Sequence, residues 1–188
     1  EELATIAVEH NLYIFSDEAY EKLVYGKPHV SMGSLNGMEK YTVSFYTFSK
    51  SYAMCGYRVG YAVGPKLLID AMTKTHIYTT LCAPTLSQMV AAKALTIDGK
   101  YIEAMRKEYD QRRKFIVKRL NEIRLPTVIP DGAFYTFSNI KHLTDDSYRL
   151  ALHLLQEGKV AVMPGKEFRS YGEGYIRCSY ATALPKIE

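Results

Sequence analysis

The sequence predicts an α/β fold, in which a mixed, mostly parallel sheet with flanking helices is followed by a smaller α+β C-terminal domain. Short apolar strands alternate with helical segments in the first half of the chain. A long amphipathic helix follows, and several strands with one further helix come after it. We therefore expect one domain at residues 1–100 and a second at residues 101–188, with the long helix belonging to the second.

The expected strands of the first domain are apolar or β-branched runs, and the first two end abruptly in polar residues. They are placed at 12–15, 41–46 and 58–64. Helices are expected at 1–10, from Pro65 to about His76, and from Pro84 to about Asp98, because proline suits the first turn of a helix. Ligands of such a covered sheet gather at the carboxyl ends of its strands.

The second domain begins with a helix at 101–123, whose apolar residues recur at spacings of three, four and seven and which would be about 35 Å long. Beyond Pro126 and Pro130 the pattern changes to short strands around a single helix. The expected elements are strands at 133–137, 160–163 and 175–180 and a helix at 147–157.

Charge and composition exclude several functional classes. The net charge of +4 is a mild excess, and the densest basic stretch, 112–124, carries apolar residues at helical spacing. That pattern is typical of a solvated helix face, so we expect no nucleic-acid partner. No apolar run approaches the ~20 residues of a membrane helix, so no membrane partner is expected either. Three widely spaced cysteines indicate no metal site and favour a reducing, cytoplasmic location.

Polar residues with chemical potential stand near the ends of predicted strands. Asp17 and Tyr20 follow the first strand, Lys50 follows the second, and Arg58 lies eight residues further on. Each has an ordinary structural interpretation: a helix cap, a packed aromatic, a solvated lysine or a surface arginine. Together they meet the needs of pyridoxal phosphate, which requires an amine for a Schiff base, a carboxylate for its pyridine nitrogen, a phenol near its 3-oxygen and a cation with hydroxyls for its phosphate.

Four motifs, in the same order along the chain, resemble the pyridoxal-phosphate-dependent aminotransferases of fold type I, class I/II. They are Ser-Asp-Glu-Ala-Tyr at 16–20, Thr-Phe-Ser-Lys-Ser-Tyr-Ala-Met-Cys-Gly-Tyr-Arg-Val-Gly-Tyr at 47–61, Gly-Ala-Phe-Tyr at 132–135 and Gly-Glu-Gly-Tyr-Ile-Arg-Cys-Ser-Tyr-Ala at 172–181. The resemblance implies a catalytic Lys50 that forms the Schiff base. It also implies the cofactor ligands Asp17, Tyr20, Thr47 and Arg58, and it places Arg177 on the substrate's α-carboxylate. The Ser49 hydroxyl is a further candidate ligand of the phosphate by its chemistry.

By the same resemblance, the enzyme transfers an amino group between an L-amino acid and a 2-oxo acid such as 2-oxoglutarate by ping-pong kinetics, as a homodimer. No arginine lies between Arg58 and Arg106, which favours aromatic or broad substrates over strict aspartate specificity. Two alternatives stay open: a carbon–sulfur lyase built on the same lysine, and a non-catalytic ligand-sensing module.

The chain departs from the family pattern in three ways. Thr47 stands where many members have serine, and Arg169 follows Phe168 where members more often have glycine. Family members are also about twice this length, beyond the usual size of one domain. We therefore expect the chain to be the C-terminal half of an enzyme and to be inactive in isolation.

Overall fold

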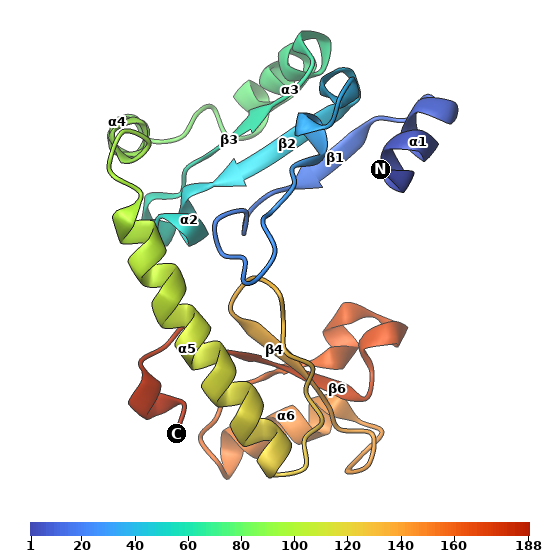
Figure 1. The fold of residues 1–188 in the computed structure, drawn as a ribbon, viewed down its shortest axis with the longest axis vertical. Helices are drawn as coiled ribbons and strands as arrows, with labels where there is room; N and C mark the ends of the chain where they lie inside the picture. Colours follow the sequence, from blue (N-terminus) through green and yellow to red (C-terminus); the bar gives the residue numbers. More distant parts are fainter. The chain divides into compact units, whose positions relative to one another are not determined.

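The computed structural model describes residues 1–188, which divide into two compact units, Glu1–Glu103 and Ala104–Glu188. Figure 1 shows the order of the elements along the chain. Each unit contains its own three-stranded sheet. None of the helices combines the length and the apolar character that a membrane-spanning segment requires.

The sheet of the first unit is mixed, as the sequence predicts. Its strands are β1 (Ile14–Asp17), β2 (Thr42–Thr47) and β3 (Gly60–Val63), in the order β1-β2-β3. β1 is parallel to β2, whereas β3 is antiparallel to it. β1 lies two residues further along the chain than predicted, because its pairing with β2 extends to Asp17 opposite Phe45. Asp17 therefore ends the strand instead of following it.

The predicted helices of the first unit are present. They are α1 (Glu2–Glu9), α3 (Lys66–Thr79) and α4 (Thr85–Ala94). A short helix, α2 (Phe48–Ser51), follows β2 directly, and single 3₁₀ turns occupy Met32–Ser34 (η1), Met38–Lys40 and Cys55–Tyr57. Pro65 and Pro84 are the residues just before α3 and α4, which confirms that these prolines mark the helix starts.

A small apolar cluster anchors α2 to the rest of the first unit. Phe48 on α2, Val59 before β3 and Ala91 on α4 are buried together, and Tyr52 and Met54 pack against them. Burying a phenylalanine side chain contributes roughly 1.5–3 kcal/mol. The cluster therefore fixes the start of α2 against two other elements, which matters because Lys50 is only two residues further on.

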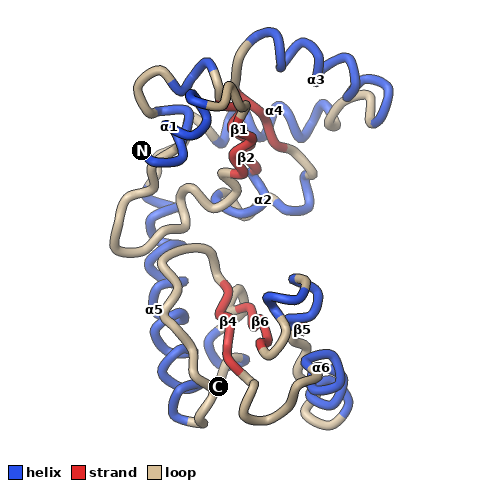
Figure 2. The backbone as a smooth tube through the Cα atoms, turned by 90° about the vertical axis from the view of Figure 1, so that its right-hand side faces the viewer, coloured by secondary structure: helices blue, strands red, loops and turns tan.

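The second unit packs an antiparallel sheet between two helices (Figure 2). Its elements are α5 (Lys100–Glu122), apart from the first turn of that helix, which lies in the first unit, and β4 (Tyr135–Asn139), α6 (Ser147–Gln156), β5 (Met163–Pro164) and β6 (Tyr175–Ser179), with strand order β4-β6-β5. The predicted strand at 160–163 is mostly wrong, because the Val160 amide donates to the Leu154 carbonyl and closes the end of α6. β4 also begins two residues later than predicted.

Arg169 adopts a backbone conformation that glycine favours, with φ 65° and ψ −168°. A side chain in this conformation costs about 1–3 kcal/mol of folding free energy. Glycine avoids that cost, but its greater freedom in the unfolded chain offsets part of the gain. We expect Arg169→Gly to raise the free energy of unfolding by about 1 kcal/mol, measured by denaturant titration. Arg169→Ala removes the same charge but keeps Cβ, so it should bring no such gain. Equal stability of the two variants would contradict strain at this position.

Candidate functional site

The polar residues singled out in the first unit gather at one edge of its sheet. β1 and β2 are parallel, so their last residues, Asp17 and Thr47, lie at the same edge. Antiparallel β3 begins at that edge, with Gly60 opposite Thr47. The backbone thus brings the segments that carry Asp17, Lys50 and Arg58 to a common edge, although Asp17 is far from the other two in sequence.

Lys50 is held by a helix that starts immediately at the end of β2. The Thr47 hydroxyl oxygen caps this helix by accepting a hydrogen bond from the Ser49 amide at 3.1 Å. The Phe48 amide donates to the Val59 carbonyl at 3.2 Å, which ties the start of the helix to the segment entering β3. Lys50 Nζ lies 5.9 Å from the centre of the Tyr20 ring. The structure therefore brings together two of the predicted site residues.

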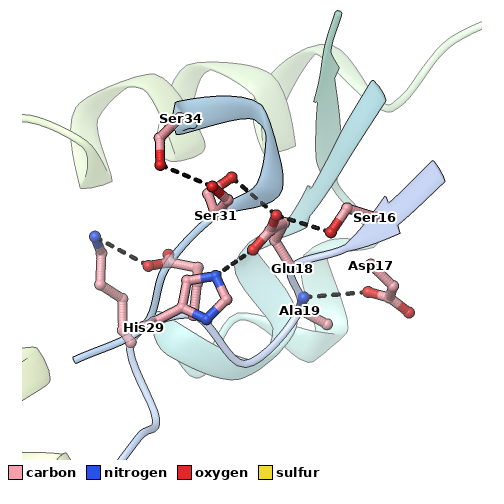
Figure 3. A network of polar contacts seen from close by, with 9 residues as sticks. Ser16, Asp17, Glu18, Ala19, His29, Ser31 and Ser34 are labelled. Carbon is pink, nitrogen blue, oxygen red and sulfur yellow. Dashed lines mark hydrogen bonds and ion pairs between the residues drawn. The ribbon is translucent and has the colours of Figure 1, made fainter. Parts of the chain in front are cut away.

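Asp17 ends β1 with its carboxylate in an exposed position. Oδ1 accepts a hydrogen bond from the Ala19 amide at 3.1 Å. Figure 3 shows this carboxylate pointing away from the side chain of Glu18, as expected for neighbours on an extended strand. Oδ2 has no partner in this chain and is available to a ligand.

Arg58 lies at the sharp turn that leads into β3. Its backbone is left-handed, with φ 51° and ψ 49°. One guanidinium nitrogen donates to the Cys55 carbonyl at 2.8 Å, and the side chain is otherwise exposed. Two residues later only glycine fits at position 60, because a Cβ there would lie 2.5 Å from the Tyr46 carbonyl oxygen. The turn thus delivers an exposed cation to the carboxyl end of β2.

Arg177 belongs to the second unit and lies on its central strand, β6. Its guanidinium carbon is 4.3 Å from the centre of the Tyr135 ring and 5.1 Å from that of Phe168. Stacking of this kind holds a planar guanidinium without using its hydrogen-bond donors. Arg177 lines a pocket of about 480 Å³ together with Tyr148, Met163, Pro164, Glu167 and Phe168.

Two features of the sites were not predicted from the sequence. The first is the pair of rings around Arg177, because their contacts depend on strand pairing and loop folding. The second is Glu18, which is buried next to Asp17 and contacts Ser16, His29 and Ser31. A glutamate in a motif of polar residues gives no sign of burial. Side chains alternate along an extended strand, so Glu18 points away from the side that Asp17 faces. This alternation is the one signal in the sequence that could have predicted the burial of Glu18.

The chain is similar to known proteins over nearly its whole length. The family model "Aminotransferase class I and II" matches residues 1–186. The chain is 48% identical to the aspartate aminotransferase of Pyrococcus abyssi, over 100% of this chain and 49% of that protein. It is 45% identical to aromatic-amino-acid aminotransferase 2 of Thermococcus litoralis, with the same coverage of both chains. The chain therefore belongs to the class I and II aminotransferase family.

Solved structures show the same fold. The aromatic aminotransferase from Pyrococcus horikoshii OT3 matches with a TM-score of 0.95 and 46% identity, over 100% of this chain and 51% of that structure. A double mutant of Thermus thermophilus aspartate aminotransferase matches with a TM-score of 0.91 and 37% identity, over 98% and 48%. The expected fold class is confirmed. The chain spans about half the length of the curated relatives that it matches.

Proposed function

We propose that this chain supplies the lysine, the cofactor ligands and the substrate arginine of a pyridoxal-phosphate-dependent aminotransferase. The activity belongs to the full-length protein, by which we mean a chain of the relatives' length that contains these 188 residues. The observation that carries the proposal is the gathering of the segments of Asp17, Lys50 and Arg58 at one edge of a sheet. An acid, an amine and a cation placed there match the three charged or reactive parts of this cofactor.

The residues present fit pyridoxal phosphate in their chemistry. Asp17 Oδ2, which has no partner in the chain, would bind the pyridine nitrogen, and the Tyr20 hydroxyl would bind the 3-oxygen. The hydroxyls of Thr47 and Ser49, with the exposed guanidinium of Arg58, would hold the phosphate. When bound, the cofactor supplies an electron-accepting ring that stabilises negative charge on the substrate's α-carbon.

Lys50 and Asp17 have distinct tasks in this proposal. Lys50 Nζ would hold the cofactor covalently and would move the proton at the substrate's α-carbon as general base and acid. The Asp17 carboxylate keeps a proton on the pyridine nitrogen, because a nearby negative charge favours the protonated form. Tyr20, whose ring lies beside Lys50, would orient both Lys50 and the cofactor.

Arg177 would bind the α-carboxylate of the substrate, since a guanidinium offers two parallel donors that match a carboxylate. We therefore propose the two domains that the sequence predicts, in which residues 1–100 hold the cofactor and residues 101–188 hold the substrate's carboxylate. The substrates proposed are an L-amino acid, whether aspartate, an aromatic residue or a broad range, and a 2-oxo acid such as 2-oxoglutarate. We further propose a homodimer located in the cytoplasm.

Incubation of the full-length protein with pyridoxal phosphate, 2-oxoglutarate and single amino acids tests the proposal. L-aspartate, L-tyrosine and L-phenylalanine are the first donors to try, and glutamate is the product expected. The measurement is glutamate formed per enzyme per unit time. Pyruvate and ammonia from a sulfur amino acid, without glutamate, would instead identify a lyase. Saturable amino-acid binding without any product would identify a sensing module.

A further inference from the structure

The side chain of Glu18 is almost fully buried beside the exposed carboxylate of Asp17. Only 2% of the residue is accessible to solvent. Its Oε1 accepts hydrogen bonds from the hydroxyls of Ser16 and Ser31, both at 2.9 Å, and its Oε2 is in hydrogen-bond contact with His29 Nε2. Figure 3 shows the three partners converging on this one carboxylate.

The three partners come from two separate stretches of chain. Ser16 lies on β1, whereas His29 and Ser31 lie in the loop that leads into η1. The carboxylate therefore ties the end of this loop back to the strand from which it departs. Burial by itself would raise the pKa of Glu18, but the hydrogen bonds from Ser31, Ser16 and His29 outweigh burial and lower it. Glu18 is therefore an anion at neutral pH and a strong acceptor for all three donors.

The loop closed in this way contains the turn that separates Asp17 from Tyr20. The Glu18 amide donates to the Phe45 carbonyl at 2.9 Å, so its backbone continues the pairing with β2. The Glu21 amide then donates to the Glu18 carbonyl, and the Leu23 amide donates to the Tyr20 carbonyl. Glu18 is thus fixed through both backbone and side chain between two residues of the candidate site.

Stability alone explains this arrangement poorly. A buried charged group adds little net stability compared with an apolar residue of similar size, because its desolvation offsets its attractions. A charge with three directional partners instead specifies one local geometry. Errors of about 1 Å in the position of catalytic groups cost roughly 100-fold in rate, so such a geometry is valuable next to a reacting cofactor.

We propose that Glu18 is a positioning residue, which holds Ser16, His29 and Ser31 at one carboxylate and so sets where Asp17 and Tyr20 present their polar atoms to the cofactor. The inference rests on the proposed function and deepens it. Glu18 touches neither cofactor nor substrate in this account, because its carboxylate faces the loop rather than the site.

The test uses Glu18→Ala and Glu18→Gln in the full-length protein. In the alanine variant we expect kcat to fall about 10- to 100-fold while KM changes little, because alignment is lost but binding groups remain. The pH at which the visible band of the bound cofactor changes should also shift, since Asp17 and Tyr20 tune the ring. Glutamine keeps an oxygen for both serines, so it should restore most of kcat.

A second readout needs no cofactor. In the cofactor-free protein, the amides of residues 18–23 should exchange hydrogen at least about 10-fold faster in Glu18→Ala than in the unaltered chain. Asn121→Ala is the matched control, because the Asn121 amide group likewise makes three hydrogen bonds that tie a loop to a helix, but in the second unit. We expect it to lower the unfolding midpoint and leave kcat and the cofactor spectrum unchanged.

The outcomes separate the two proposals. An unaltered protein that binds no cofactor would defeat the proposed function, and this inference with it. An active protein in which Glu18→Ala leaves kcat, the spectrum and amide exchange unchanged would overturn only the role of Glu18. If Glu18→Ala fails to fold, Ser31→Ala tests the inference instead. We expect this variant to lose less kcat than predicted for Glu18→Ala and to show faster amide exchange in residues 18–23. No change in that variant would equally overturn the inference.

Discussion

Replacing Lys50 with alanine is expected to lower kcat of the full-length protein by about 10⁴-fold or more, because the variant would lose both the proposed covalent attachment of the cofactor and the proposed group that moves the α-proton. Glutamate formation from an amino acid and 2-oxoglutarate measures the loss. The segment should stay folded, since α2 is anchored by Phe48 and capped by Thr47 rather than by the lysine side chain.

Lys66→Ala is the matched control for this experiment. Lys66 is an exposed lysine on α3 whose amine pairs with Asp70 at 2.7 Å. Exposed pairs of this kind contribute about 0–1 kcal/mol, so activity should be unchanged. If Lys50→Ala kept kcat within about tenfold of the unaltered enzyme, general acid–base catalysis by this lysine would be refuted.

Replacing Arg177 with lysine is expected to lower kcat/KM by about 100-fold. Lysine keeps the positive charge but loses the planar pair of donors and the stacking on Tyr135 and Phe168. The KM values for the amino acid and for the 2-oxo acid should rise together, because both substrates carry the carboxylate that Arg177 is proposed to bind. Steady-state kinetics with each substrate varied in turn measure this.

Arg119→Lys provides the control for that substitution, since Arg119 is an exposed arginine on α5 that pairs with Glu122. Its kinetic constants should match those of the unaltered enzyme. The cofactor spectrum of Arg177→Lys should also be unchanged, because the proposed cofactor ligands all lie in the first unit. Unaltered KM values for both substrates would show that Arg177 has no part in binding the carboxylate.

Much of the architecture could be predicted from the sequence because local signals decided it. Pro65 and Pro84 mark helix starts, and the apolar spacing of α5 extends over its whole length. Strand bounds were less predictable, because they depend on partners. β1 extends to Asp17 only because Phe45 lies opposite, and the stretch before Met163 is not a strand because the Val160 amide closes α6.

In the candidate site, too, features with a local signal were predictable, whereas those that depend on distant partners were not. Asp17, Lys50 and Arg58 were found because each lies near the end of a recognisable strand in a characteristic motif. Glu18 was missed because its partners His29 and Ser31 lie in a loop whose path the sequence does not reveal. The rings beside Arg177 were missed for a related reason, since Tyr135 and Phe168 approach it only through the folding of β4 and of the loop after β5.

The proposed function requires that Lys50 carries the cofactor. Reduction of the full-length protein with borohydride in the presence of pyridoxal phosphate fixes any imine between the two as a stable amine, and mass spectrometry of the digested protein then locates it. A single modified peptide that contains Lys50 is expected. Cofactor attached to a different lysine, or to none, would contradict it.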